Sequence, residues 1–124
     1  MTATEFERGR LAALERYCIL DTDAEENFDA IARLAGNVCC APVAFISIVD
    51  GKRQWFKSRI GIDLEETARD ISFCSQAIEA AGELFVIEDT RGDARFSANP
   101  LVAGPPYIRF YAGMPFRSSD GFAL

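Results

Sequence analysis

The stretch VAFISIVDGKRQWFKSRI, residues 43–60, carries the clearest structural signal in this sequence. Residues 43–49 are rich in β-branched and aromatic side chains, and Asp50-Gly51 is a dipeptide that favours a tight hairpin turn. Over residues 53–60 the side chains of Trp55, Lys57 and Arg59 alternate with those of Gln54, Phe56 and Ser58, which predicts a second strand antiparallel to the first. The first strand is mostly apolar on both faces, so we expect it to be covered on both sides, whereas the second should be more exposed.

Two amphipathic helices are predicted before this hairpin. The first covers residues 4–18, and the polar side that we expect to face water includes Arg10. Its packing side is formed by Leu11, Leu14 and Cys18. The second helix begins at a capping box, for which the sequence offers two pairs, Thr22 with Glu25 or Asp23 with Glu26. Its apolar stripe consists of Phe28, Ile31, Leu34, Ala35 and Val38.

The elements after the hairpin are shorter and are separated by polar segments. A short helix at about residues 72–81, ended by Gly82, is followed by predicted strands at 84–88 and 107–114. Between the two strands lies a loop that contains several Gly and Pro residues, residues 89–106. A loop this long in a compact domain more often has a function than serves only as a connection. This order of helices and antiparallel strands predicts an α+β fold.

Composition excludes several classes of function. The 124 residues include 13 Lys and Arg against 19 Asp and Glu, and a net charge of −6 argues against a nucleic-acid partner. The absence of histidine excludes Ser/His/Asp and Cys/His catalysis and histidine-ligated metals, so no metal site is predicted. No apolar run is long enough for a membrane span and the polar N-terminus lacks a signal core, so we expect a cytoplasmic chain.

Four cysteines invite a redox interpretation, but their spacing forms no C-x-x-C pair. We therefore expect Cys18, Cys39, Cys40 and Cys74 to be free thiols that pack as small apolar side chains, with one of Cys39 and Cys40 partly exposed. Cys74 lies at the start of the predicted short helix, where a helix N-terminus lowers a thiol pKa. It is either a reactive thiol or a packing residue.

Several segments together resemble a bacterial GAF domain, of the type found near the N-termini of sensor histidine kinases and diguanylate cyclases. These segments are LERYCILDT (14–22), RQWFKS (53–58), SFC (72–74), RGDARF (91–96), NPLV (99–102) and IRFYAGMP (108–115). The resemblance implies an antiparallel sheet flanked by helices and one GAF domain over residues 1–124. It also implies a further Gly-rich strand, which lies beside the first strand, then another strand and a closing helix. We therefore expect the domain to be incomplete at its C-terminus, as a fragment or with the strand supplied by another chain.

The resemblance further implies a non-catalytic sensory domain that binds a small molecule and relays a signal. Its output domain would lie outside this chain and be of the histidine kinase or diguanylate cyclase type, and a homodimer is possible. No cofactor is identified. Candidate ligand-binding residues are Phe45, Ser47, Phe73, Cys74, Asp89, Asp93, Arg95, Asn99, Arg109 and Tyr111.

Some of these residues have alternative interpretations. Arg91 and Arg95 either clamp an anionic ligand together with Asp93 or belong to a solvated loop in which Asp93 caps a turn. Arg109 either faces the ligand or forms an ion pair with a nearby carboxylate. The candidate carboxylates are Asp70, Glu88 and Asp89.

Three classes of function make different structural predictions. A ligand sensor should show an enclosed pocket with convergent polar groups near Ser47 and Tyr111. A dimerisation module should fill that space with aromatic side chains and expose a large apolar helix face. A cysteine-based methionine-sulfoxide reductase, the third alternative, needs two sulfur atoms close together beside an open cleft.

Overall fold

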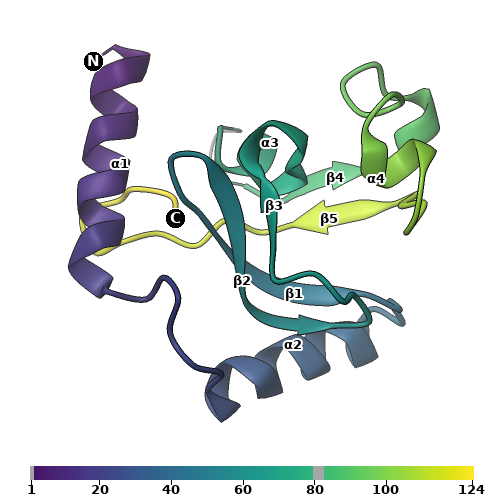
Figure 1. Cartoon of the computed structure of the whole chain (residues 1–124), viewed down its shortest axis with the longest axis horizontal. Helices are drawn as coiled ribbons and strands as arrows, with labels where there is room; N and C mark the ends of the chain where they lie inside the picture. The colour runs from purple at the N-terminus through teal and green to yellow at the C-terminus, as the bar shows by residue number, and fades with distance from the viewer. Residues whose placement is uncertain (1, 80–82) are drawn as a thin grey trace.

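The computed structural model describes residues 2–79 and 83–124 and has a mixed α+β architecture (Figure 1). Its α-helices are α1 (Ala3–Tyr17), α2 (Glu26–Val38), α3 (Phe73–Glu79) and α4 (Pro100–Ala103). Its strands are β1 (Ala44–Val49), β2 (Arg53–Ile60), β3 (Glu66–Ala68), β4 (Phe85–Ile87) and β5 (Tyr111–Gly113), and its 3₁₀ turns are η1 (Arg69–Ile71) and η2 (Thr90–Gly92).

The predicted α+β fold with antiparallel strands is confirmed. The strands form two sheets, one with the order β1-β2-β3 and one with β4-β5 (Figure 1). The predicted short helix is present as α3, but its expected last residues and the glycine stop at Gly82 lie outside the described residues.

The predicted hairpin is the β1–β2 pair, which runs from Ala44 opposite Ile60 to Val49 opposite Gln54. The expectation that the second strand is the more exposed one is wrong. Residues 54–58 are all buried, because β3, which the sequence analysis missed, pairs with the other edge of β2 and makes β2 the central strand.

Helix α1 begins in a capping box. The backbone N–H of Glu5 donates to the Thr2 hydroxyl at 3.1 Å, and the Thr2 N–H donates to the Glu5 carboxylate at 2.9 Å. The predicted packing face of this helix is partly wrong, because Arg10 is fully buried and Cys18 is exposed. Ala13 and Leu14 pack against the sheet, and this orientation turns Arg10 inward.

Neither predicted capping box begins helix α2. Its N-cap is Glu25, which makes no side-chain capping hydrogen bond. The residues expected to cap it surround Lys57 of β2, whose side chain is fully buried. The Lys57 ammonium donates to the Thr22 hydroxyl at 2.7 Å and to the Asp23 carbonyl at 2.6 Å, and it pairs with Glu25 at 2.7 Å. A buried ammonium needs such partners, and this need determines the conformation of the connection between α1 and α2.

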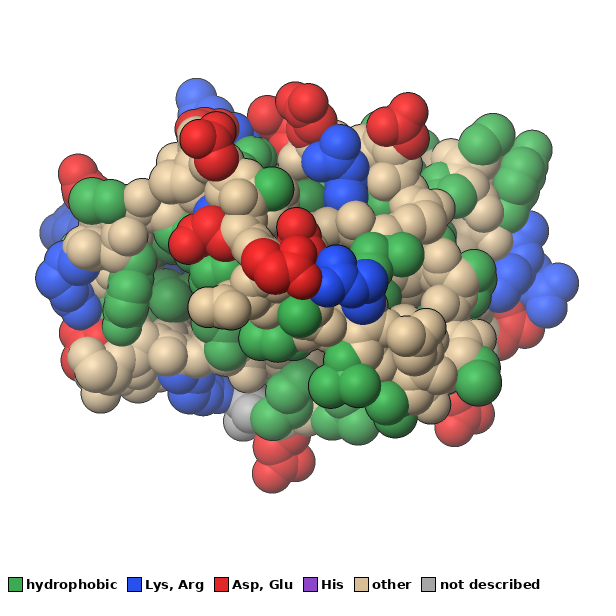
Figure 2. Space-filling model, turned by 90° about the horizontal axis from the view of Figure 1, so that it is seen from below, with side chains coloured by type: hydrophobic (Ala, Val, Ile, Leu, Met, Phe, Trp, Pro, Cys, Tyr) green, Lys and Arg blue, Asp and Glu red, His purple; other side chains and the backbone are tan. Residues whose placement is uncertain are grey.

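Most of the apolar stripe of α2 faces away from the sheet. The exposed fractions of Ile31, Leu34 and Val38 are 58%, 62% and 73%. The helix packs instead through buried Ala32, and its orientation is held by Ser58 of β2, which donates a 2.6 Å hydrogen bond to Asp29. Figure 2 views the molecule from below, the side where α2 lies in Figure 1, and shows apolar side chains at the surface among charged ones.

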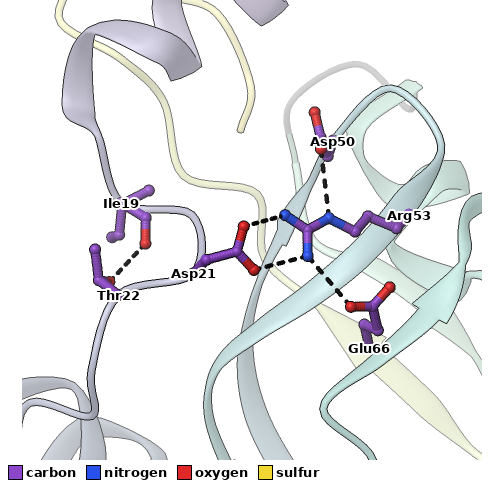
Figure 3. A network of polar contacts seen from close by, with 6 residues as sticks. All are labelled: Ile19, Asp21, Thr22, Asp50, Arg53 and Glu66. Atoms are coloured by element: carbon purple, nitrogen blue, oxygen red, sulfur yellow. Dashed lines mark hydrogen bonds and ion pairs between the residues drawn. The ribbon is translucent and has the colours of Figure 1, made fainter.

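An ion network fastens the connection between α1 and α2 to the hairpin (Figure 3). Arg53 donates two hydrogen bonds to Asp21, at 2.9 and 2.7 Å, and also contacts Asp50 and Glu66. The hydrogen bonds from Arg53 lower the pKa of Asp21 below its ordinary value. The network therefore joins three segments that are distant in the sequence around one guanidinium group.

The apolar interior is divided into separate clusters. One joins α3, β4 and β5 with the loop between the two strands, and its buried members are Phe73, Ala77, Ile87, Phe96, Val102 and Tyr111. A second lies between α1 and the hairpin, with buried members Ala13, Leu14, Ile48, Trp55 and Leu124. Leu124 also accepts a backbone hydrogen bond from Val49 at 3.2 Å, so the end of the chain lies beside β1.

Within the described residues, no helix combines the length and the apolar character that a membrane crossing requires.

Candidate functional site

The structure brings several predicted site residues together around the sulfur of Cys74. Ser47 of β1 donates a hydrogen bond to this sulfur at 3.1 Å, and the Tyr111 hydroxyl of β5 lies at 3.1 Å from it. Gln54 of β2 donates to it at 3.3 Å, and Ser72 in turn donates to the Gln54 side-chain oxygen. We call these five residues, Ser47, Gln54, Ser72, Cys74 and Tyr111, the Cys74 cluster. It joins both sheets to the start of α3.

Aromatic rings fill the space beside the Cys74 cluster. Phe73 stacks on Phe96 with ring centroids 4.7 Å apart, and on Tyr111 with centroids 5.1 Å apart. Phe73 and Phe96 are 3% and 2% exposed, and the half-buried Phe45 packs against the same rings. The aromatic filling agrees with the expectation for a dimerisation module. Polar groups converge as expected for a sensor, but aromatic rings occupy the space of the enclosed pocket that the sensor expectation also named.

The burial of Cys74 works against a reactive thiol. Burial raises the pKa of this thiol above its ordinary value, although the hydrogen bonds from Ser47 and Tyr111 oppose the shift. Burial also raises the pKa of the Tyr111 hydroxyl, and the neighbouring Cys74 adds to that effect. Both groups are therefore protonated at neutral pH, and the predicted lowering of the Cys74 pKa by a helix N-terminus is wrong because desolvation dominates.

The other cysteines correct a second expectation. All four are free, as predicted. Cys74 is partly buried, but Cys18 is exposed, and so are both Cys39 and Cys40, of which one was expected to pack in the core. The three exposed cysteines follow the last turns of α1 and α2, at positions where the chain turns away from the helix. Among the described residues, no group of His, Cys, Asp and Glu has the arrangement of a metal site.

The charged residues of loop 89–106 do not reach the Cys74 cluster as an anion clamp. Arg91 pairs with Asp89 and Arg95 pairs with Asp93, each through two side-chain hydrogen bonds of 2.8–3.1 Å. These pairs are local, and the hydrogen bonds lower the pKa of both aspartates. Asp93 also caps a turn by accepting from the Arg95 N–H at 2.9 Å, as one of the two interpretations predicted.

The remaining two candidates, Asn99 and Arg109, have structural partners. Asn99 caps α4 by accepting from the Leu101 N–H at 2.8 Å, and its amide donates to the Ile71 carbonyl at 2.9 Å. Arg109 donates to the Val102 carbonyl at 2.8 Å and forms no ion pair among the described residues. Of the two interpretations of Arg109, the ion pair with Asp70, Glu88 or Asp89 is not formed among the described residues, and Nη1 donates to backbone carbonyls instead.

Sequence analysis missed three residues of the site. Gln54 was placed on an exposed strand, and its burial depends on the pairing of β2 with β3. Ser72 belongs to the quoted SFC segment, but its contact with Gln54 joins residues 18 positions apart. Phe96 ends the RGDARF segment, where alternation gives no indication of burial.

A second arrangement of charges lies between α1 and the start of α3. Glu7 of α1 accepts two hydrogen bonds from Arg10, each 3.0 Å long, and two more from Arg69 of η1. Burial opposes ionisation of Glu7, but the hydrogen bonds from Arg10 and Arg69 outweigh it and lower its pKa to about 2. These residues border an open hollow of about 600 Å³, whose other lining residues are Thr2, Ala3, Phe6, Ile78 and Glu79.

The fold is an α+β domain with a buried polar cluster, and comparison with known proteins identifies the family. A family model described as the GAF domain matches residues 23–123, and the chain belongs to this family. A cyclic di-GMP phosphodiesterase of Pseudomonas aeruginosa is 42% identical to the chain over 120 residues. The match covers 97% of this chain but only 20% of that relative, so the chain spans about a fifth of the relative's length. The expected GAF domain is confirmed, whereas the expected kinase or cyclase type is not shown, because this relative is named as a phosphodiesterase.

Proposed function

We propose that the chain is a non-catalytic regulatory GAF domain of a bacterial cyclic di-GMP signalling protein. In this proposal a small molecule binds at the Cys74 cluster, and the domain passes the signal to an output domain outside these residues. Membership of the GAF family and the similarity to a cyclic di-GMP phosphodiesterase support the regulatory role. The same similarity favours cyclic di-GMP turnover as the output, in place of the kinase or cyclase output expected from the sequence.

The observation that carries the ligand site is the convergence of polar groups inside an apolar core. Gln54 and Ser72 are each 3% exposed, and Tyr111 is 8% exposed. Buried polar groups need hydrogen-bond partners, and here these groups satisfy one another through Cys74. A ligand with donors and acceptors would exchange these internal hydrogen bonds for its own. Binding would require Phe73 and Phe96 to separate, and so would select a conformation in which loop 89–106 has moved.

The cysteine chemistry supports a non-catalytic role. An attacking thiolate needs a lowered pKa and a resolving thiol within reach. Burial raises the pKa of the Cys74 thiol, and the other three cysteines lie exposed at the ends of α1 and α2. This arrangement gives the methionine-sulfoxide reductase alternative no support.

A thermal-shift screen tests the ligand proposal. The panel contains nucleotides, cyclic nucleotides including cyclic di-GMP, amino acids and small carboxylates. A ligand at 100 times its Kd stabilises the folded state by about 2.7 kcal/mol, which raises the unfolding midpoint measurably. The shift should disappear in Ser47→Ala and Tyr111→Phe and persist in the controls Ser119→Ala and Tyr107→Phe, whose side chains are exposed. A shift that survives the first two variants argues against this site, and a panel without any shift argues against ligand binding.

A second candidate function, an interaction module without a ligand, is favoured by the exposed apolar side chains. Ile31, Leu34 and Val38 are exposed on α2, and Phe110 and Met114 flanking β5 are 59% and 66% exposed. Such surfaces commonly mark contacts with another protein. Sedimentation over a range of protein concentrations tests this function. Leu34→Lys should abolish a concentration-dependent dimer that Ala12→Lys, a control at an exposed position of α1, leaves intact. A monomer at all concentrations argues against self-association.

A further inference from the structure

We propose that Arg69 couples the Cys74 cluster to helix α1, so that a change in the cluster alters how firmly α1 is held. The inference deepens the proposed function by naming the contact through which the ligand site would act on α1. It rests on that function for the direction of the signal, although the coupling itself requires no ligand.

The first part of the connection runs from the cluster to the backbone of Arg69. Ser72 donates its side-chain hydroxyl to Gln54 inside the cluster, and its backbone N–H donates to the Arg69 carbonyl at 3.1 Å. Gln54 is also paired with Thr67 in the β2–β3 ladder, two residues before Arg69. The position of Arg69 is therefore tied to the cluster from both sides, through Ser72 and through β3.

The hairpin holds Arg69 as well. Its backbone N–H donates to the Lys52 carbonyl at 3.0 Å, and its guanidinium donates to the Asp50 carbonyl at 3.2 Å. These contacts fix the side chain in the direction of α1. A displacement of Ser72 is thus transmitted to a guanidinium group that has little freedom to adjust by itself.

The second part of the connection runs from Arg69 to α1 through Glu7. Arg69 donates two hydrogen bonds to the Glu7 carboxylate, which also accepts two from Arg10. The Arg10 side chain is fully buried, and its Nη1 atom has no hydrogen-bond partner in residues 2–79 and 83–124. Loss of its carboxylate partner would strongly destabilise a buried guanidinium group, so Glu7 must stay paired with Arg10 while it binds Arg69. Movement of Arg69 therefore weakens the charge arrangement that holds the first half of α1.

A simple clamp is the alternative: Arg69 would hold α1 without responding to the cluster. The two possibilities differ in one measurable quantity. Substitutions at separated sites that share no partner usually have additive effects on stability, whereas substitutions at coupled sites do not. Gln54 and Glu7 make no hydrogen bond to each other in the described chain, so non-additivity between them would have to pass through the intervening residues.

A double-mutant cycle with Gln54→Met and Glu7→Gln tests the proposal, with urea unfolding as the readout. Methionine keeps the volume of Gln54 and removes its hydrogen bonds to Ser72 and Cys74. Each variant gives a ratio of its unfolding constant to that of the wild type. We expect the ratio for the double variant to differ at least fivefold from the product of the two single-variant ratios. The matched control cycle replaces Gln54→Met by Val102→Ala, at a residue that is 2% exposed in the same aromatic cluster but has no side-chain hydrogen bond. In this control cycle the double-variant ratio should agree with the product of the single-variant ratios to within twofold.

Hydrogen exchange supplies an independent readout. In Gln54→Met, amide exchange in α1 should become faster by at least fivefold more than amide exchange in α2. The measurement is made at a urea concentration at which the free energy of unfolding of Gln54→Met equals that of Val102→Ala. If Glu7→Gln does not fold, Arg69→Lys replaces it, because lysine keeps the charge but cannot donate two parallel hydrogen bonds. Additivity in both cycles, or equal non-additivity in both, overturns the coupling. Neither result bears on ligand binding, and a negative ligand screen leaves the cycle unaffected.

Discussion

Replacing Glu7 by glutamine removes a charge that two guanidinium groups share. Burial by itself raises the pKa of Glu7, but the hydrogen bonds from Arg10 and Arg69 lower it by more. The net result is a pKa of about 2, below the ordinary value of 4.5. Each tenfold change in proton affinity corresponds to about 1.4 kcal/mol, so the ionised side chain contributes at most about 3 kcal/mol. The carboxylate is 31% exposed, and water screens part of this interaction. We therefore expect Glu7→Gln to lower the free energy of unfolding by about 2 kcal/mol at pH 7.

The pH dependence of this effect follows from the lowered pKa. Above about pH 4.5 the Glu7 carboxyl is ionised in both the folded and the unfolded chain, and its full contribution is present. As the pH falls from about 4.5 to about 2, the unfolded chain takes up the proton first, and the stability gained from Glu7 is lost. The stabilities of the wild type and of Glu7→Gln should therefore converge over this range.

Urea unfolding followed by circular dichroism, at pH 7 and in an acid series, measures both expectations. The matched control is Glu15→Gln, which removes the same charge from the same helix at an exposed position without a side-chain hydrogen bond in the described chain. This control should change the free energy of unfolding by less than about 0.5 kcal/mol. The reasoning is refuted if Glu7→Gln loses no more stability than Glu15→Gln, or if its deficit stays constant down to pH 2.5.

Two further predictions concern a turn and a thiol. Gly61 has φ +78°, and a Cβ atom there would lie 1.9 Å from the Pro42 carbonyl oxygen, so Gly61→Ala should cost more than about 2 kcal/mol in urea unfolding. Gly92→Ala is the control because its Cβ would meet nothing within 4 Å, and equal losses would contradict the argument. In a variant with the other three cysteines replaced by serine, Cys74 should react with Ellman's reagent at least 100-fold more slowly than it does in urea. Rapid reaction of the folded protein would contradict its burial.

The elements that local sequence determines were predicted well. The hairpin at residues 43–60 follows from two β-rich runs around Asp50-Gly51, and the structure has both strands and their antiparallel pairing. Asn99, named from the sequence as a ligand-binding candidate, caps α4 through an equally short-range contact. In these cases the partners lie within a few residues of one another, so the sequence contains the whole interaction.

Burial of charged residues could not be predicted from the sequence. Arg10 was expected to face water and Thr22 to cap a helix, yet Arg10 is buried beside Glu7, and Thr22 accepts a hydrogen bond from the buried Lys57. The rotation of α2, with Asp29 bound to Ser58, likewise exposes part of an apolar stripe that periodicity marks as a packing face. The positions of Thr22 and Asp29 depend on partners in another segment of the chain, and the burial of Arg10 depends on how α1 packs against the sheet.

The candidate site shows the same division. Four residues predicted for the site do converge, namely Ser47, Phe73, Cys74 and Tyr111. Asp93 and its neighbours in loop 89–106 form local ion pairs instead. Gln54 was missed because its burial requires a third strand whose three residues carry little signal of their own.

The sequence by itself determined the α+β class, the GAF family, the hairpin and the absence of histidine chemistry. These properties depend on composition, on short-range preferences and on the order of recognisable segments. The tertiary structure alone decided which charges are buried, which face of α2 is exposed and which polar groups surround Cys74. The physical reason is that burying a charge or a polar group is favourable only when its partner is present, and the partners come together only in the folded chain.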